Sequence, residues 1–321
     1  MNYVATGYHH ITACAAGAQE DVNFFTGVVG QRLAKQTVLM DGKAPHYHLY
    51  YSNAHIEPGS IMTTFPYKNR PGKRGSGQVQ SIVYTVAKGA LPFWQEHFKK
   101  HKVEHSSIGE RFGQHFIRFS HPAGLSFEVL EDKDDQRVPW TTKEIAAGEA
   151  IHGFHGTVLS VRDISEQEKF LVEAIGFRKT GVDGTYHRFE IGSGGANKTL
   201  ILQHEPDRAP GSWTFGAGTV HHIALWVADD EAMAAQKAIY EELGYTDASE
   251  IKDRYYFHSM YCRCPGGILV ESCCNIDQSF EKDETRSELG KKLHLPPWWA
   301  DRKEEMMKSL ETIVVPETAT A

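Results

Sequence analysis

A weak internal repeat runs through the whole chain. Four strand-like segments have similar beginnings, namely HHITACA from His9, QSIVYTV from Gln80, FHGTVLSV from Phe154 and HHIALWV from His221. Their alignment places four residues at equivalent positions, at intervals of 71, 74 and 67 residues: His10, Ser81, His155 and His222. Self-similarity at a near-constant period indicates that one supersecondary unit is repeated. We therefore expect the chain to fold from four copies of one unit.

Each strand-like segment is followed by a stretch with a helical pattern. These stretches are Asp21–Gly30, Ala90–His101, Ser165–Gly176 and Asp230–Gly244. Three of them end in glycine, the residue that best tolerates the left-handed conformation at a helix end. Runs rich in β-branched and aromatic residues follow, and the last run of each unit is GSIMTTF, GLSFEVL, KTLILQH or GILVESC. The pattern predicts an α+β fold of four βαβββ units with cupped mixed sheets.

The segment that separates the first two units from the last two is charged and lacks strand alternation. It reads EDKDDQRVPWTTKEIAAGEA, and we interpret residues 133–150 of the chain as a linker. A chain of 321 residues is long enough for two domains. We expect an N-terminal domain at 1–132 and a C-terminal domain at 151–275, each of two units. The tail at 276–321 contains DRKEEMMKSLETI, which predicts a short packing helix.

Composition restricts the class of protein. Hydrophobic residues make up 40% and charged residues 23% of the chain, which is typical of a soluble globular protein. The formal net charge of -7 gives no reason to expect nucleic acid as a partner. We find neither a secretory signal in MNYVATGYHH nor an apolar run long enough to cross a membrane. Five cysteines without a disulfide-like spacing indicate a reducing compartment, so we expect a cytoplasmic protein. The sequence leaves open whether it forms a homo-oligomer.

Two His-His pairs open strands at equivalent positions of the first and fourth units. Alternate side chains of a strand share a face, so His10 and His222 are expected on the concave side of one sheet. The last strand of the fourth unit adds Glu271 in register. Two imidazoles and one carboxylate can bind one face of a divalent metal and leave the other face open. The sequence therefore predicts a three-ligand metal centre.

The repeat supplies an internal control for this prediction. If units one and four share a site, its four positions are His10, Thr63, His222 and Glu271. If units two and three share one, the positions are Ser81, Glu128, His155 and Gln203, which include only two good ligands. We therefore expect one metal site.

Other residues with metal-binding potential lack such a constellation. Seven other histidines are expected to be ordinary surface or core residues, namely His46, His48, His97, His101, His105, His115 and His204. Cys262-x-Cys264 and Cys273-Cys274 do not have the spacing of two zinc-binding CxxC arms.

At these residues the sequence resembles the vicinal oxygen chelate (glyoxalase-like) superfamily and, within it, the hydroquinone ring-cleaving dioxygenases. The stretches that carry the resemblance are HHIT (9–12), YHLYY (47–51), MTTFP (62–66), RFGQ (111–114), FEVLED (127–132), HEPDR (204–208), GSW (211–213), HH (221–222) and PGG (265–267) with Glu271. The resemblance extends from about residue 7 to residue 300. It implies two glyoxalase/dioxygenase-like domains, and it implies Fe(II), with Mn(II) as the alternative, bound by His10, His222 and Glu271.

The resemblance also implies a set of residues that line the site: His9, Thr12, His221, Arg254 and Tyr261. Strand alternation supports Thr12, which shares a face with His10. Strand alternation predicts that His9 and His221 point away from the expected ligands His10 and His222. A β-bulge, or a supporting role behind the ligands, would reconcile this expectation with the resemblance. Arg254 is equally consistent with an ion pair to Asp253 or Glu250, and Tyr261 with a core aromatic.

The implied activity is ring cleavage of a small aromatic substrate by O2, with hydroquinones, alkylated or halogenated, as substrates in aromatic compound degradation. Two alternatives stay open at this point. One is a glyoxalase-type metal isomerase or thiol transferase, which commonly needs a fourth protein ligand, whereas Thr63 is a poor one. The other is a non-catalytic protein that sequesters an aromatic compound or a metal.

Overall fold

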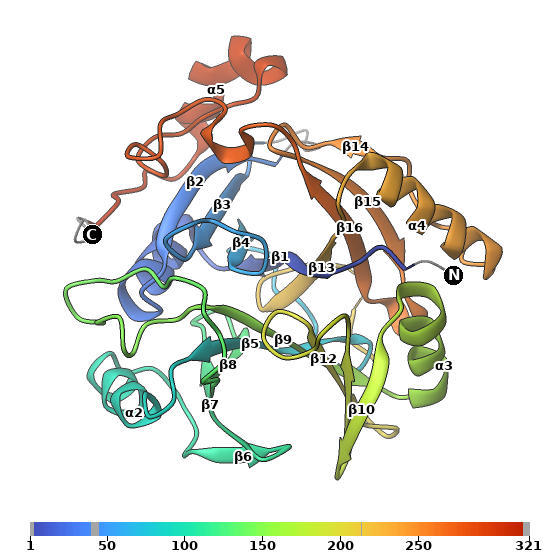
Figure 1. The fold of residues 1–321 in the computed structure, drawn as a ribbon. Helices are drawn as coiled ribbons and strands as arrows, with labels where there is room; N and C mark the ends of the chain where they lie inside the picture. The colour runs from blue at the N-terminus through green and yellow to red at the C-terminus, as the bar shows by residue number, and fades with distance from the viewer. Residues whose placement is uncertain (1–2, 40–44, 213, 317–321) are drawn as a thin grey trace.

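Two curved eight-stranded sheets dominate the computed structural model, which describes residues 3–39, 45–212 and 214–316 (Figure 1). In spatial order, the first sheet contains β14 (Lys252–Asp253), β15 (Phe257–Arg263), β16 (Leu269–Asn275), β13 (Thr219–Trp226), β1 (Gly7–Ala15), β4 (Ile61–Pro66), β3 (Tyr47–Ser52) and β2 (Arg32–Val38). The second contains β10 (Arg178–Asp183), β11 (Tyr186–Glu190), β12 (Thr199–His204), β9 (Gly153–Val161), β5 (Gln78–Val86), β8 (Ser126–Glu131), β7 (Gln114–Ser120) and β6 (Gly109–Arg111). Both sheets mix parallel and antiparallel pairs, as predicted.

One helical segment follows the first strand of each unit. These segments are α1 (Ala18–Asn23) with a π-helical turn (Phe24–Val28), α2 (Leu91–Lys100), α3 (Ile164–Lys169) with a π-helical turn (Phe170–Ile175), and α4 (Asp230–Glu242). The order strand, helix and three strands therefore recurs four times, which confirms the predicted unit. Gly30 and Gly176 end the first and third helical segments with φ values of 74° and 96°, a conformation that glycine adopts without strain.

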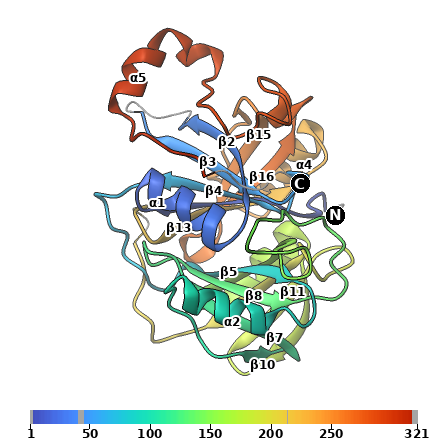
Figure 2. The same cartoon turned by 90° about the vertical axis from the view of Figure 1, so that its left-hand side faces the viewer.

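The tail as far as residue 316, where the described part ends, contains three further short helical segments, and one more turn precedes β16. They are Pro265–Gly267 before β16, Ser279–Glu281, Pro297–Arg302 and α5 (Lys303–Ser309). The helix α5 lies in the stretch for which the sequence predicts a short helix. In both views it stands at the edge of the molecule beside the first sheet (Figures 1 and 2).

Each sheet combines one unit from each half of the chain. The antiparallel pair β1–β13 joins units one and four, and the pair β5–β9 joins units two and three. This confirms the pairing on which the three-ligand metal site depends. Each sheet contains strands from both sides of the segment 133–150. The predicted domains at 1–132 and 151–275 are therefore not the same as the two sheets, and the division into domains stays a prediction.

The two sheets share a large apolar core. Ile11 and Leu225 of the first sheet belong to the same buried cluster as Tyr84 and Phe154 of the second. Burying an aliphatic side chain of this size stabilises a fold by about 1.5–3 kcal/mol. Because side chains alternate along β1, packing Ile11 into this core turns His10 to the opposite face of the sheet.

The described residues include no helix that is both long enough and apolar enough to span a membrane.

Candidate metal centre and active site

His10, His222 and Glu271 converge on one point of the first sheet. Their atoms lie on three adjacent strands, β1, β13 and β16. His10 Nε2 lies 3.0 Å from His222 Nε2, and Glu271 Oε2 lies 2.9 Å from His222 Nε2 and 3.5 Å from His10 Nε2. All three side chains are buried. The structure thus brings together the three residues that the sequence singles out, in a cluster that could hold a metal ion.

The electrostatics of this cluster suit a cation. Burial alone would raise the pKa of Glu271, but the neighbouring His10 and His222 hold that pKa well below its usual range, so the carboxylate is ionised. Burial lowers the pKa of His222, which favours the neutral imidazole that a metal requires. Glu271 Oε1 accepts a hydrogen bond from Ser259, whereas the buried Glu271 Oε2 lies against the two imidazole nitrogens and accepts no hydrogen bond of acceptable geometry from any described residue. A buried carboxylate oxygen without a partner is costly unless a cation compensates it.

Two β-bulges explain how His9 and His221 reach the site. In the β1–β13 register Tyr8 pairs with Leu225 and His10 with Ala224, so His9 is an extra residue. On the other strand His222 pairs with Thr12 and Val220 with Ala13, so His221 is the extra residue there. A bulge locally breaks the alternation of side chains. The expectation from simple alternation, that both histidines point away from the ligands, is therefore wrong.

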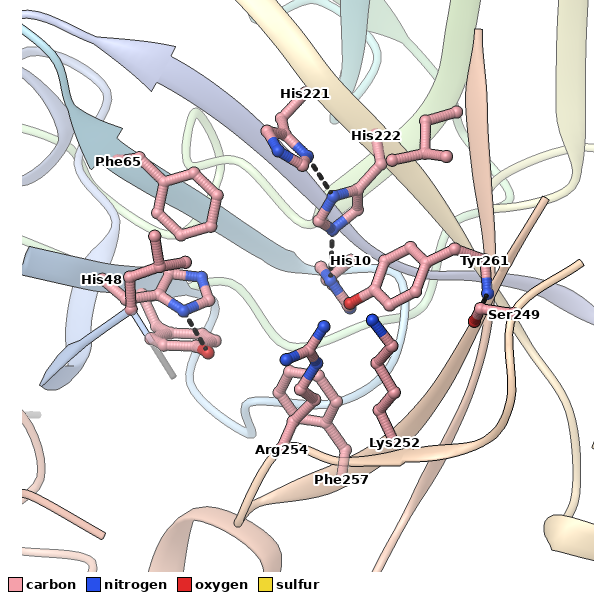
Figure 3. Close-up of a pocket in the computed structure, with 13 residues that line it drawn as sticks. His10, His48, Phe65, His221, His222, Ser249, Lys252, Arg254, Phe257 and Tyr261 are labelled. Carbon is pink, nitrogen blue, oxygen red and sulfur yellow. Dashed lines mark hydrogen bonds between the residues drawn. The ribbon is translucent and has the colours of Figure 1, made fainter. Parts of the chain in front are cut away.

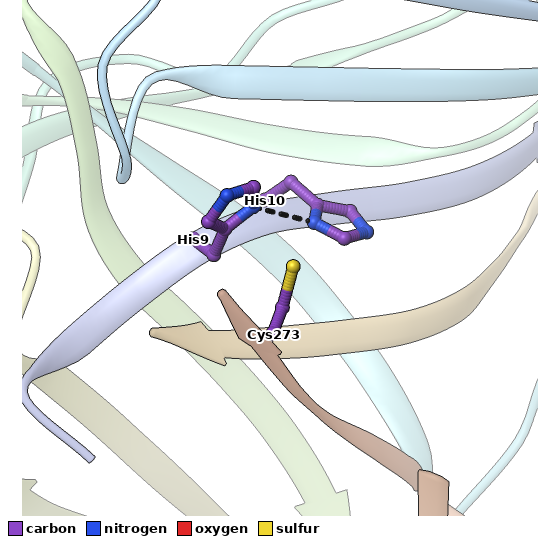
Figure 4. A group of neighbouring side chains, drawn as sticks. All are labelled: His9, His10 and Cys273. Atoms are coloured by element: carbon purple, nitrogen blue, oxygen red, sulfur yellow. Dashed lines mark hydrogen bonds between the residues drawn. The ribbon is translucent and has the colours of Figure 1, made fainter. Parts of the chain in front are cut away.

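His9 links His10 to the end of β16. His9 Nδ1 lies 2.9 Å from His10 Nδ1 (Figure 4), and His9 Nε2 lies 2.8 Å from Asn275 Oδ1. Burial, with a contribution from His10, lowers the pKa of His9 to about 3, so its ring is neutral. Because an amide oxygen only accepts, His9 Nε2–H donates to Asn275, and His10 Nδ1–H then donates to His9 Nδ1. This order leaves a lone pair on His10 Nε2, the nitrogen that faces the cluster.

His221 stands behind His222 in a similar way. His221 Nδ1 lies 2.8 Å from His222 Nδ1, and the His221 ring stacks on Phe215 at a centroid distance of 3.7 Å. Burial lowers the pKa of His221 to about 2. Each of the two imidazoles that face the cluster is thus held by a second, neutral histidine.

Cys273 also lies close to His9 and His10 (Figure 4). Burial, reinforced by the charge of Glu271, raises the pKa of its thiol well above the usual value. The thiol is therefore protonated, which makes it a poor metal ligand compared with a thiolate.

A pocket of about 370 Å³ opens in front of the cluster. Tyr261 and Arg254 both line it, together with His10, His221 and His222 (Figure 3). Tyr261 pairs with Glu271 across β15 and β16, so the two side chains share a face, and the Arg254 guanidinium lies 5.3 Å from the centre of the Tyr261 ring. Thr12 is buried beside His222 and accepts a hydrogen bond from Thr63 at 2.7 Å. All five residues that the resemblance implies therefore lie at or directly beside the site.

Several residues that line the pocket were not identified as site residues from the sequence. They are Leu39, His48, Tyr50, Phe65, Ser249, Lys252, Phe257 and Leu269. The expectation that His48 is an ordinary core or surface residue is wrong, because its ring forms part of the pocket wall. Strand alternation could have placed it there, since His48 shares a face of β3 with Tyr50, and Tyr50 pairs with Thr63 of β4.

The second sheet has a different cluster at the equivalent place. Glu128 corresponds to Glu271 in the repeat and is fully buried, but its carboxylate binds Arg111 at 2.7 Å and Arg118 at 2.9 Å. The Arg111 guanidinium lies between the rings of Phe116 and Tyr186, 4.9 and 5.0 Å from their centres. Guanidinium groups of the chain itself neutralise the carboxylate here.

Comparisons with known proteins support the same assignment. Residues 153–272 match the family model of the glyoxalase/bleomycin resistance protein/dioxygenase superfamily, whose members bind a metal. The chain is 40% identical over 313 residues to the chlorohydroquinone/hydroquinone 1,2-dioxygenase of Sphingobium indicum, covering 96% of this chain and 97% of that protein. It is 35% identical over 305 residues to MhqO of Bacillus subtilis, which its name assigns to the ring-cleaving dioxygenases, covering 95% of each chain.

Solved structures agree on the fold. A crystal structure of a Bacillus subtilis protein assigned to the dioxygenases superposes with a TM-score of 0.91 at 34% identity, covering 98% of this chain and all of that chain. Glyoxalase I from Zea mays superposes with a TM-score of 0.61 at 16% identity, covering 84% of this chain and 93% of that chain, and shares the fold alone. From its sequence relatives, its sheet architecture and its clustered histidines and glutamate, we conclude that the chain belongs to the ring-cleaving dioxygenases of the glyoxalase/dioxygenase superfamily.

Proposed function

We propose that this enzyme cleaves the ring of hydroquinones with O2, using Fe(II) bound by His10, His222 and Glu271. The observation that carries the proposal is the buried Oε2 of Glu271, which faces two imidazole nitrogens and accepts no hydrogen bond from the part of the chain that the structure describes. Two histidines and one carboxylate on one side of an open position are the donor set of non-haem Fe(II) oxygenases, and Mn(II) is the alternative metal. Bound Fe(II) would supply a path for electrons between the aromatic ring and O2.

Residues of the pocket suit a phenolic substrate. The Arg254 guanidinium lines the pocket and can bind an ionised hydroxyl group. Burial, together with the charge of Glu271, raises the pKa of Tyr261, so its hydroxyl keeps its proton and can donate it in a hydrogen bond. The rings of Phe65 and Phe257 provide apolar walls that contact an aromatic ring and exclude water.

The surroundings of Thr63 speak against the glyoxalase-type alternative. Thr63 Oγ1 lies 2.9 Å from His48 Nε2 and donates to Thr12. Its oxygen is therefore engaged in hydrogen bonds, and it does not serve as the fourth protein ligand that such enzymes commonly use.

The proposal extends to the cellular setting. The five cysteines are free and buried, in keeping with a reducing compartment, and we propose a cytoplasmic enzyme whose partners are a small aromatic substrate and O2. The relative from Sphingobium indicum, which has hydroquinone in its name, supports the substrate class.

Oxygen consumption tests the proposed function. The protein is loaded with Fe(II) without air, and an oxygen electrode then follows uptake with hydroquinone, chlorohydroquinone and catechol in parallel. We expect uptake with the hydroquinones and a ring-opened product that contains the added oxygen. No uptake by a protein with a full complement of iron would refute the dioxygenase assignment.

His9→Gln is expected to weaken iron binding roughly 10–100-fold, the usual effect of removing the hydrogen-bond partner of a metal-bound histidine. The physical reason is that glutamine has no polar atom in the place of His9 Nδ1, so His10 Nδ1 loses the acceptor that orients its ring. Iron retained after gel filtration at limiting metal measures the effect. His97→Gln is the matched control, because His97 is buried but bonds to the carbonyl of Val28 outside the pocket. Equal iron affinity in the wild type and His9→Gln would rule out a supporting role for His9.

A further inference from the structure

We propose that Tyr50, oriented by His48, accepts a hydrogen bond from the second hydroxyl group of the substrate and thereby selects para-dihydroxybenzenes. This inference rests on the proposed function, because it assigns a binding role within the same pocket. Tyr50 would contact the substrate, whereas His48 would act as a positioning residue.

The two side chains form a polar patch in the pocket wall. Both are buried on β3, with exposed fractions of 7% for His48 and 1% for Tyr50, and both line the pocket with His10 and His222. Figure 3 shows His48 and Phe65 on one side of the pocket, with Tyr261 on the other and the two ligand histidines between them. A ring held at the ligand histidines can therefore extend toward this patch.

The hydrogen bonds within the patch determine whether it can donate or accept a hydrogen bond. The Thr63 hydroxyl donates its only hydrogen bond to Thr12, so its oxygen accepts a hydrogen bond from His48 Nε2–H, 2.9 Å away. His48 Nδ1 then carries no proton and accepts a hydrogen bond from the Tyr50 hydroxyl, 2.9 Å away. Both nitrogens of His48 are occupied, and the Tyr50 oxygen keeps lone pairs but offers no proton. The patch can accept a hydrogen bond from a ligand, but it has no proton left to donate.

Aromatic packing holds the Tyr50 ring in place. The Tyr50 ring packs against Phe280 and Phe257, at centroid distances of 5.2 and 6.4 Å. The apolar side chains of Phe65 and Leu39 line the same pocket. A buried polar group of this kind discriminates between ligands, because a ligand that leaves it unpaired removes its contact with water and provides no hydrogen bond in return.

Substrate geometry connects this patch to selectivity. Both hydroxyl groups of a catechol sit at one end of the ring, so they lie together at the metal. A hydroquinone places its second hydroxyl group at the opposite end, away from the metal. Only the hydroquinone brings a proton to the end of the pocket where Tyr50 offers an acceptor.

Binding measurements without air test the inference. The iron-loaded protein is titrated calorimetrically with hydroquinone, with phenol, which lacks the distal hydroxyl, and with 4-methoxyphenol, which keeps the distal oxygen but no proton. We expect the wild type to bind hydroquinone about 5-fold more tightly than either analogue, the typical effect of one neutral hydrogen bond. Tyr50→Phe should bring the hydroquinone-to-phenol ratio to about one. Tyr51→Phe is the matched control, since Tyr51 is also buried on β3 but belongs to the core on the other face, and it should keep the wild-type ratios.

His48→Leu separates positioning from a merely structural role. Without the acceptor at Nδ1, the Tyr50 hydroxyl proton becomes available to a ligand, so discrimination against 4-methoxyphenol should fall while discrimination against phenol persists. An unchanged hydroquinone-to-phenol ratio in Tyr50→Phe, or no preference in the wild type, would overturn the inference. Oxygen uptake by the wild type is measured separately. If the wild type consumes oxygen but Tyr50→Phe keeps the wild-type hydroquinone-to-phenol affinity ratio, only this inference is refuted. If the iron-loaded wild type consumes no oxygen, the proposed function is refuted.

Discussion

Glu271→Gln is expected to reduce ring cleavage on the order of 1,000-fold, more than the roughly 10–100-fold effect of changing a residue behind a metal ligand. Glutamine keeps the shape of the side chain but removes the charge that compensates the cation, and its amide nitrogen has no lone pair for a metal. The hydrogen bond from Ser259 to the first carboxylate oxygen can persist, so the fold should remain intact. Iron content by elemental analysis and oxygen uptake measure the two effects.

The expected results for related variants sharpen this prediction. His10→Ala should lose iron and turnover together, because the lone pair of His10 Nε2 faces the same point. Glu250→Gln removes a carboxylate that pairs with Lys237 at the surface, and it should leave both quantities at the wild-type level. Wild-type iron content and turnover in Glu271→Gln would exclude the carboxylate as a ligand.

Arg111→Met is expected to destabilise the protein by about 3 kcal/mol, the lower end of the range for removing one partner of a buried ion pair. Glu128 is fully buried, and Arg118, whose side chain is 40% exposed, would be its remaining partner. Met keeps much of the apolar volume between Phe116 and Tyr186, so the loss is chiefly electrostatic. The midpoint of urea denaturation, followed by circular dichroism, measures the change.

Two companion variants test the cause. Arg118→Met should have a smaller effect, since the exposed guanidinium is already screened by water. The double variant Arg111→Met/Glu128→Leu removes both buried charges and should recover most of the lost stability. If Arg111→Met unfolds at the same urea concentration as the wild type, the buried pair does not stabilise the second sheet.

The repeat made most of the architecture predictable from the sequence. The recurrence of strand, helix and three strands followed from periodicity and from glycines such as Gly176, which occupies the left-handed region. The pairing of units one and four followed from chemistry, because only that pairing collects His10, His222 and Glu271. Sheet order itself is set by contacts over more than 200 residues of sequence, such as His10 with Ala224, which local patterns do not encode.

Local irregularities limited the prediction of the site. Strand alternation assumes a regular ladder, and the bulges at His9 and His221 break that rule at the two positions where the site needs extra side chains. His48 was missed for a different reason. A single histidine in an apolar strand carries no signal of its own, and its role became visible only through its partners Tyr50 and Thr63.

The pairing of the first and last units in one sheet has a consequence for how the enzyme folds during its synthesis. As the chain leaves the ribosome, His10 emerges early, while Glu271 follows more than 250 residues later. The strand β1 cannot join β13 and β16 in one sheet until those strands have been synthesised, and long-range pairing of this kind is slow compared with local folding. The proposed metal site is therefore complete only in chains whose first and last units have paired in one sheet.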